Sequence, residues 1–201
     1  MKIRGRRVPT LKRGSTIKSS HWLNRGFSLI ELMVVLTIVG IVIRIATSTY
    51  SSVIIASNIS SESNSFWGDL QYAHSQAIKQ GLTVTVCAAN TSGNAPYTCS
   101  GSTTTWSSGW VTYTGSYTTT TGAVTQALLL RVRQPLLSTY AMKSTSTNAL
   151  TSLSFNSFGF STTRGSVTVS PPSGSSVSSK TVCISAVGNV QIVSGGDSAC
   201  P

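Results

Sequence analysis

A single carboxylate stands inside a long apolar stretch near the start of the chain. Residues 27–43 read FSLIELMVVLTIVGIVI, and Glu31 is the one charged residue among them. A carboxylate is costly in apolar surroundings, so such residues are rare and usually serve a function or pair with another group. A buried carboxylate is stabilised by a positive partner and by hydrogen bonds. We therefore expect Glu31 to pair with a cation from outside its own segment.

Four cysteines are the second group of residues with a definite chemistry: Cys87, Cys99, Cys183 and Cys200. All of them follow the apolar stretch, and an even count in an oxidising compartment indicates two disulfide bonds. Three connectivities are open. We favour Cys87–Cys99 and Cys183–Cys200, because each closes a local loop and the second would hold the C-terminal tail in place. No pair has the close spacing of a zinc site, so we expect no metal.

Candidate catalytic residues are scarce after residue 26. This part of the chain has one histidine, His74, and two aspartates that belong to no recognisable nucleophile motif. It contains neither a phosphate-binding loop nor a dinucleotide-binding fingerprint. We expect His74 to lie on a helix surface or to pack against the rest of the protein rather than to act as a base. The chain is therefore predicted not to be an enzyme and to need no cofactor.

Most of the positive charge lies at the beginning of the chain. The net charge is +11 and the isoelectric point is near 10.0, which would ordinarily indicate a nucleic acid or an acidic lipid as partner. Eight of the 15 basic residues precede position 27, without any acid: Lys2, Arg4, Arg6, Arg7, Lys12, Arg13, Lys18 and Arg25. The remainder holds seven basic residues and four acids, a net charge of +3, and is only mildly basic.

The apolar stretch has the length of a short membrane span. A basic flank precedes it, so we expect residues 27–46 to cross a membrane once, with the N-terminus in the cytoplasm and the rest of the chain outside. Arg44 is expected to extend its side chain to the outer interface, or to pair with an acid on another subunit. No small-x-small cleavage site follows near residues 44–50, which disfavours a secretory signal peptide.

The helix is expected to continue beyond the span. Phe66, Leu70, Ala73 and Ala77 recur at intervals of four, three and four, which places them on one helix face. Gly81 follows as a helix stop. The second half of this helix should therefore pack on the remainder of the protein.

From residue 82 the pattern changes to that of β-strands. Leu82, Val84 and Val86 alternate with polar or small residues, as in a half-buried strand. Stretches rich in Ser, Thr, Gly and Pro indicate loops at 90–108, 114–122, 142–151 and 170–180. Further strands are expected at 109–114, 127–132, 153–155, 166–169, 181–185 and 189–193. Trp106 and Trp110 are expected to be core or loop-anchoring residues, with a partner surface as the alternative.

A short motif precedes the apolar stretch. Its sequence, Arg25-Gly26-Phe27-Ser28-Leu29-Ile30-Glu31-Leu32, joins a basic residue, Gly, Phe, a hydroxyl residue, two aliphatic residues and Glu. It resembles the processing signal of the type IV pilin-like superfamily. The resemblance implies that a prepilin peptidase removes residues 1–26 as a leader by cutting between Gly26 and Phe27, and that Phe27 is then N-methylated. Glu31 would pair with the N-terminal amine of a neighbouring subunit, set the register and aid extraction from the bilayer.

A series of short motifs follows in the rest of the chain. They are Ala77-Ile78-Lys79-Gln80-Gly81, Val84-Thr85-Val86-Cys87, Trp106 with Ser108-Gly109-Trp110-Val111, Leu153-Ser154-Phe155-Asn156 before Gly159, and Thr181-Val182-Cys183-Ile184-Ser185 before Gly188. Their order resembles the FimT/GspH family of minor pilins and H-type minor pseudopilins of type II secretion. The resemblance implies an α+β fold. A long N-terminal transmembrane and assembly helix, 27–81, would pack on a C-terminal β-sandwich-like head of two antiparallel sheets, 82–201.

Some members of this family bind DNA through a Gly-Arg-x-Arg pattern after the last Cys-Ile-Ser-type strand. The matching residues here, Gly188-Asn189-Val190-Gln191, carry neutral residues in place of both arginines. Because affinity for DNA depends mainly on cations near phosphates, this disfavours a DNA role. Arg131 and Arg133 would share one strand face and offer another contact. The full set of alternative DNA contacts is Arg131, Arg133, Lys143, Arg164 and Lys180.

The resemblance implies a filament subunit. We expect a minor type IV pilin that primes or caps pilus assembly at the filament tip. Its partners would be other minor and major pilins, the prepilin peptidase and the inner-membrane assembly platform. It would be embedded in the inner membrane before assembly and lie in a pilus or pseudopilus afterwards. A DNA-binding minor pilin for natural transformation and a minor pseudopilin of type II secretion are the alternatives.

Overall fold

The computed structural model describes most of the chain from Gly26 onward. The described residues are 26–93, 96–100, 104–116, 123–124, 128–144, 150–196 and 200, and the side chains of residues 45–49 are not among them. The expected leader therefore lies outside the described residues, apart from Gly26. The chain divides into two compact units, Met1–Ile43 and Arg44–Pro201, and each is described by itself.

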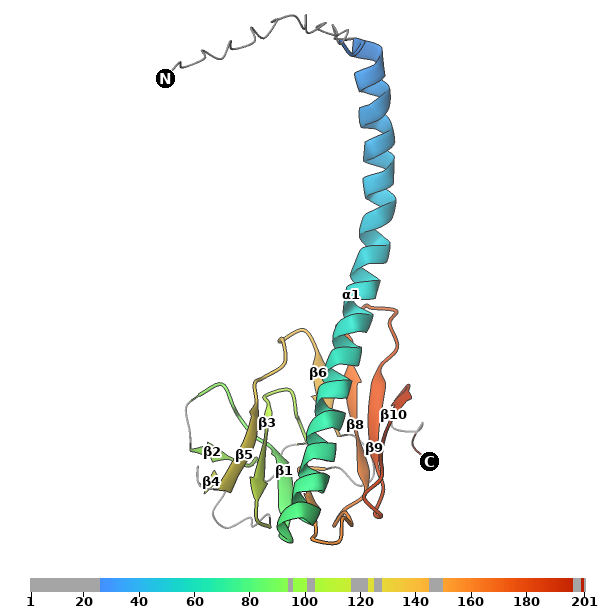
Figure 1. Cartoon of the computed structure of the whole chain (residues 1–201). Coiled ribbons are helices and arrows are strands. Elements are labelled where there is room, and N and C mark those ends of the chain that lie inside the picture. The colour runs from blue at the N-terminus through green and yellow to red at the C-terminus, as the bar shows by residue number, and fades with distance from the viewer. Residues whose placement is uncertain are drawn as a thin grey trace, which may run out of the picture. The chain divides into compact units, whose positions relative to one another are not determined.

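One long helix, α1, spans Leu29–Gln80 (Figure 1). It ends at the expected stop, because Gly81 has a φ of +66°, a left-handed conformation that glycine adopts without strain. The N–H of Leu82 donates to the carbonyl of Ala77 at 3.3 Å, which is the pattern of a Schellman cap. This bond satisfies a carbonyl of the last helical turn as the chain turns toward the first strand.

One face of α1 lies in the core of the Arg44–Pro201 unit. Phe66, Leu70, Ala73 and Ala77 are each at most 1% exposed, so the helix face expected from their spacing is confirmed. Ile59 extends the same buried face toward the N-terminus. This half of the helix is therefore stabilised by tertiary packing rather than by helix propensity alone.

Two four-stranded antiparallel sheets and a small two-stranded sheet accompany the helix in the described part of the chain (Figure 1). The first sheet has the strand order β5-β3-β1-β7, the second has the order β10-β9-β8-β6, and β2 pairs with β4. The strands are β1 Val84–Ala88, β2 Tyr97–Thr98, β3 Trp110–Thr114, β4 Ala123–Val124, β5 Leu129–Arg133, β6 Ala141–Lys143, β7 Ser152–Phe155, β8 Gly165–Ser170, β9 Lys180–Ile184 and β10 Val190–Ser194. The expected α+β fold, with a long helix and two antiparallel sheets, is confirmed.

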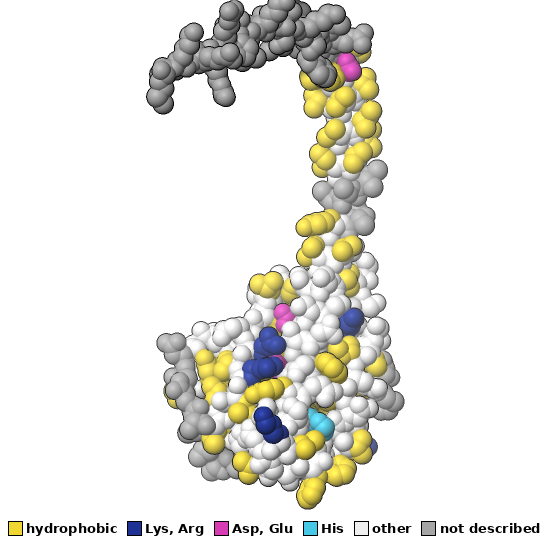
Figure 2. Space-filling model, in the orientation of Figure 1, with side chains coloured by type: hydrophobic (Ala, Val, Ile, Leu, Met, Phe, Trp, Pro, Cys, Tyr) yellow, Lys and Arg dark blue, Asp and Glu magenta, His cyan; other side chains and the backbone are white. Residues whose placement is uncertain are grey.

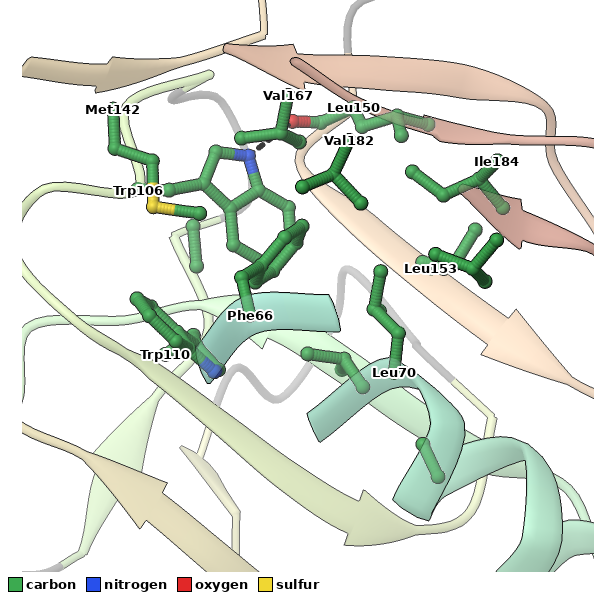
Figure 3. Close-up of a cluster of buried hydrophobic side chains, with 14 of the residues drawn as sticks. Phe66, Leu70, Trp106, Trp110, Met142, Leu150, Leu153, Val167, Val182 and Ile184 are labelled. Carbon is green, nitrogen blue, oxygen red and sulfur yellow. Dashed lines mark hydrogen bonds between the residues drawn. The ribbon is translucent and has the colours of Figure 1, made fainter. Parts of the chain in front are cut away.

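The helix and both large sheets share one hydrophobic core (Figure 3). Leu70 comes from α1, Leu153 from the first sheet, and Val167 and Val182 from the second, and all four belong to one buried cluster. Side chains alternate between the two faces of a strand, so each sheet supplies one inward-facing set to this cluster. The core thus fixes how the second half of α1 lies on the sheets.

Three aromatic side chains form the centre of this core (Figure 3). Phe66 meets both Trp106 and Trp110 edge-on, with ring centroids 5.2 Å apart in each pair, a favourable aromatic geometry. The indole N–H of Trp106 donates to the carbonyl of Leu150 at 3.0 Å. Both tryptophans are at most 1% exposed. Their interpretation as core residues is confirmed.

The first strand is buried on both faces, where a half-buried strand was expected. Every residue of Val84–Ala88 is buried. Val86 lies in the main core, whereas Cys87 belongs to a second cluster on the other face. The hydroxyls of Thr85 and Ser154 share a hydrogen bond of 2.7 Å. The polar alternation in the sequence therefore reflects an internal hydrogen bond rather than contact with solvent.

A short strand occupies the beginning of a segment that was expected to be a loop. Strand β6 covers Ala141–Lys143 and pairs antiparallel with β8. Met142 is fully buried and lies opposite Val169. A three-residue strand is too short to show periodicity, so tertiary packing decides it. The expectation of a loop is wrong for residues 142 and 143, and residues 145–149 lie outside the described part of the chain.

Two disulfide bonds join strands to segments that follow them. Cys87 in β1 is bonded to Cys99, and Cys183 in β9 is bonded to Cys200 near the C-terminus. These are the two pairings favoured from the sequence. The bonded residues are 12 and 17 positions apart, so each bond restricts a short loop in the unfolded chain.

Candidate functional site

The apolar N-terminal segment begins with a helix start that contains Glu31. Helix α1 starts at Leu29, and the carbonyl of Ser28 accepts a hydrogen bond from the N–H of Leu32 at 3.1 Å. Ser28 and Glu31 have the spacing of a capping box, and a negative charge in the first turn is favourable for the helix dipole. Phe27 is 77% exposed. The start of the helix therefore accommodates Glu31 at the surface, four residues after the expected mature N-terminus.

Large apolar side chains are exposed along the whole described part of this segment (Figure 2). Their exposed fractions range from 45% at Val39 to 77% at Phe27. The residues are Phe27, Leu29, Ile30, Leu32, Met33, Val34, Val35, Leu36, Ile38, Val39, Ile41, Val42 and Ile43. A helix that is apolar on all sides is normally covered by lipid or by other protein. We call residues 27–43 the apolar segment.

The expected membrane span at 27–46 stays a prediction. Within the part of the chain that the structure describes, no helix is both long enough and apolar enough to cross a membrane. The side chains of residues 45 and 46, which end the expected span, lie outside the described set.

A fully buried carboxylate, Asp69, joins α1 to the first sheet. Its side chain is 0% exposed. The indole N–H of Trp110 donates to Asp69 Oδ2 at 2.9 Å, and a buried carboxylate requires partners of this kind. Sequence reasoning missed this residue. A signal was present, because Asp69 follows Phe66 by three positions and precedes Ala73 by four, which places it on the apolar helix face.

Two arginines of β5, an edge strand of the first sheet, complete the pairing of Asp69. Arg131 Nη1 lies 2.6 Å from Asp69 Oδ1, and Arg133 Nε lies 2.7 Å from Asp69 Oδ2. The guanidinium group of Arg131 also lies over the ring of Tyr72, 4.2 Å from its centroid, which is a cation–π contact. The two arginine side chains remain 41% and 40% exposed. Two of the expected DNA contacts are therefore partners of a buried acid.

The other expected DNA contacts lie on or next to the second sheet. Lys143 ends β6, Lys180 begins β9, and Arg164 precedes β8. Met142 pairs with Val169, and Val169 pairs with Lys180. Because adjacent residues of a strand point to opposite faces, Lys143 and Lys180 lie on opposite faces of the sheet. The five basic residues therefore belong to two different sheets and their flanks, and a contact with DNA through them stays a prediction.

Comparison with known proteins places the chain in a family. Residues 62–188 match the family described as type II transport protein GspH. This match covers more than half of the chain. The chain belongs to the GspH family. Residues 23–45, which include the expected processing site, match the prokaryotic N-terminal methylation motif. Among curated proteins, no match to this GspH-family chain is found.

Solved structures include proteins with a similar fold. The crystal structure of the type IV minor pilin FimU from Pseudomonas aeruginosa is 20% identical, with a TM-score of 0.50, and the match covers 71% of this chain and 92% of that chain. The minor pseudopilin EpsH from the Type 2 Secretion System of Vibrio cholerae is 13% identical, with a TM-score of 0.48, over 68% of this chain and 97% of that chain. The likeness to FimU shows a shared fold.

His74 of this GspH-family protein is a packing residue. Its ring lies edge-on to Phe155, with centroids 5.3 Å apart. Gly159, with a φ of +85°, passes close beside it, since a Cβ atom there would lie 2.7 Å from His74 Nε2. Gly188, with a φ of +82°, also borders the His74 ring. The interpretation of His74 as a packing residue is confirmed.

Proposed function

We propose that this GspH-family chain is a minor pilin or minor pseudopilin that joins a filament through its apolar segment. The observation that carries the proposal is the segment itself, which is exposed and apolar on all sides, with Glu31 in its first turn and a methylation motif around it. Exposure of so much apolar surface to water is unfavourable. Lipid would cover the segment before assembly, and helices of other subunits would cover it afterwards.

Processing would create the group that Glu31 needs. Cleavage between Gly26 and Phe27 removes the basic leader and leaves an amine on Phe27, which is then methylated. The match of residues 23–45 to the methylation motif supports this order of events. Before assembly, the chain would lie in the inner membrane through residues 27–46, with the N-terminus in the cytoplasm and the β-rich head in the periplasm.

Glu31 would act by pairing with the N-terminal amine of an adjacent subunit. Among the described residues, Glu31 takes part in none of the ion pairs. A carboxylate placed between packed apolar helices would be strongly unfavourable without a positive partner. Pairing with the neighbour's amine would therefore favour one axial register of the two helices over others.

The subunit would prime or cap a filament together with other minor pilins, rather than form its length. The similar fold of FimU, a type IV minor pilin, supports a place among minor subunits. Major pilins, the prepilin peptidase and the inner-membrane assembly platform would be the further partners. A pilus and a type II secretion pseudopilus are both consistent with a GspH-family chain that carries this motif.

The test is incorporation of the full-length chain into filaments in cells that assemble them. Wild type and Glu31→Gln are compared for leader removal, by mass, and for their amount in sheared filaments. We expect both chains to be cut after Gly26, whereas Glu31→Gln is strongly depleted from filaments because its amide cannot neutralise an amine. Glu62→Gln, an acid on the same helix within the Arg44–Pro201 unit, is the matched control and should assemble like wild type. Normal incorporation of Glu31→Gln would contradict the proposal.

A role in DNA uptake is not favoured. Arg131 and Arg133 are engaged by Asp69, and the other three basic candidates lie on or beside a different sheet. Binding of DNA requires several cations that face the phosphate backbone together. The structural subunit therefore remains the function that the geometry supports best.

A further inference from the structure

The arginine pair on β5 carries more positive charge than its buried partner neutralises. Two guanidinium groups meet one carboxylate, so the cluster of Asp69, Arg131 and Arg133, which we call the arginine clasp, has a net charge of +1. Each guanidinium group has five N–H donors. The bonds to Asp69 use one N–H direction of Arg131 and two of Arg133. Donor capacity therefore remains on the parts of both side chains that face solvent.

Buried contacts hold the two arginines of the clasp in position. Asp69 is fully buried and is itself fixed by the indole N–H of Trp110. Tyr72 supports the guanidinium plane of Arg131 from one side. Exposed arginines normally lose side-chain entropy when they bind a partner. Here the buried contacts have already oriented both groups, which lowers that cost.

The position of the clasp makes it accessible to another protein. Strand β5 is at the edge of the first sheet, and about two-fifths of each arginine side chain is exposed. Paired, planar guanidinium groups match the two oxygens of a carboxylate and bind it in a bidentate manner. The surface is thus complementary in charge and in shape to an acidic side chain.

We propose that the arginine clasp is a docking site for an Asp or Glu side chain of an acidic segment on a neighbouring filament subunit. The proposal rests on the proposed function, because that function supplies the neighbour. Asp69 acts as the positioning residue, and Arg131 and Arg133 make the contact. The acid of the partner would bring the net charge of the clasp from +1 to zero. The site would therefore favour subunits that present a carboxylate opposite Arg131 and Arg133.

An acidic protein segment fits the site better than a nucleic acid. A phosphate backbone presents many charges in a row, and its affinity comes from several cations that act together. The clasp offers a net charge of +1, and Lys143 and Lys180 lie on the second sheet, on opposite faces. A single carboxylate needs no more than the two arginines.

The test measures binding of a defined acidic probe to the full chain after leader removal, purified in detergent. A fluorescein-labelled hexaglutamate peptide is titrated and followed by fluorescence anisotropy, with hexaglutamine and a 12-nucleotide single-stranded DNA as parallel probes. The double variant Arg131→Gln/Arg133→Gln should weaken hexaglutamate binding at least about tenfold. The matched control, Lys143→Gln/Arg164→Gln, loses the same charge on and beside the second sheet and should change binding less than about twofold.

A second variant covers the case in which the double glutamine variant fails to fold. Arg131→Lys/Arg133→Lys keeps both charges and the pairing with Asp69 but removes the planar forks. We expect it to keep the circular dichroism spectrum of the wild type and to bind hexaglutamate several-fold more weakly. Equal binding by wild type and the lysine variant would overturn the docking site, since charge alone would then explain the affinity.

Three other outcomes would also overturn it: equal weakening by the control variant, equal binding of hexaglutamine, and preferential binding of the DNA probe through the two arginines. The last result would assign the clasp to nucleic acid. The proposed function is tested separately: normal entry of Glu31→Gln into filaments would contradict it. That result would not alter the binding of hexaglutamate to the clasp.

Discussion

The two halves of helix α1 each carry an acid on an apolar surface, but they satisfy it in different ways. In the C-terminal half, Asp69 is 0% exposed and receives hydrogen bonds from Trp110, Arg131 and Arg133. In the N-terminal half, Glu31 is exposed among exposed apolar side chains, and the described residues offer it no ion pair. One acid is thus a structural element of the fold. The other would, in the proposed function, find its partner on a neighbouring subunit.

The difference shows how one continuous helix can serve two purposes. Where the helix lies on the sheets, its buried face stabilises the Arg44–Pro201 unit. Asp69 favours one position of α1 on the first sheet, because its partners come from specific positions of β3 and β5. Among the described residues of the apolar segment, Glu31 has no such ion-pair partner, and under the proposed function it would instead pair with another subunit. Three predictions test this division of roles.

The largest contrast should come from truncating an apolar side chain in each half. Phe66→Ala removes the ring that contacts both Trp106 and Trp110, and it should lower the free energy of unfolding by about 3–5 kcal/mol. Leu36→Ala, at a position that is 62% exposed, should leave that free energy unchanged. Urea denaturation of the full chain in detergent, followed by tryptophan fluorescence, measures both. Equal losses would mean that the apolar segment contributes to the same folding unit.

A reciprocal pair of substitutions compares the two acids. Asp69→Asn leaves two arginines without their carboxylate and should lower the free energy of unfolding by about 2–4 kcal/mol. Glu31→Gln should leave the urea midpoint unchanged, although it reduces filament entry as described above. The midpoints of both variants are read in the same denaturation assay. A lower midpoint for Glu31→Gln would show that Glu31 has an internal partner, and the distinction between the two acids would fail.

The smallest effect concerns a buried hydroxyl group that, unlike the carboxylate of Asp69, has no hydrogen-bond partner among the described residues. Thr112 lies opposite Arg131 in the sheet, and its hydroxyl is buried without a hydrogen-bond partner among the described residues. Thr112→Val removes an unsatisfied group at nearly constant volume and should raise the free energy of unfolding by about 1 kcal/mol. Its control is Ser144→Ala, because the Ser144 hydroxyl donates to Ser166 O at 2.6 Å and accepts from the Leu150 N–H at 2.8 Å. This control should destabilise the protein by about 1–2 kcal/mol. A loss for Thr112→Val would show that the hydroxyl has a partner.

Much of the fold could be predicted from local patterns. The intervals between Phe66, Leu70, Ala73 and Ala77 indicated the buried helix face because helical periodicity is a property of the sequence alone. Gly81 marked the helix end because glycine readily adopts the left-handed conformation that ends a helix, which is also a local property. The weaker predictions concerned strands, where burial depends on neighbours. The alternation over residues 82–87 predicted a half-buried strand, but β1 is a central strand between two buried clusters and has no solvent face.

The candidate site could be predicted only in part. The motif around Gly26, Phe27 and Glu31 is contiguous, so it is readable without a fold. Arg131 and Arg133 could be placed on one strand face, because the pleat alone requires it. Their assignment to DNA rested on charge without knowledge of the partner. That partner, Asp69, lies 62 and 64 residues away in the sequence.

Residues close together in the chain encode the methylation motif, the apolar segment with its single acid and the periodic helix face, so local sequence is enough to specify each of them. Tertiary structure alone decided the strand order, the burial of β1 on both faces and the pairing of Asp69 with two arginines of an edge strand. Those features depend on how α1 packs against the sheets, and packing is a property of surfaces that segments distant in sequence form together. The same packing turned two ordinary surface cations into an oriented, half-exposed pair.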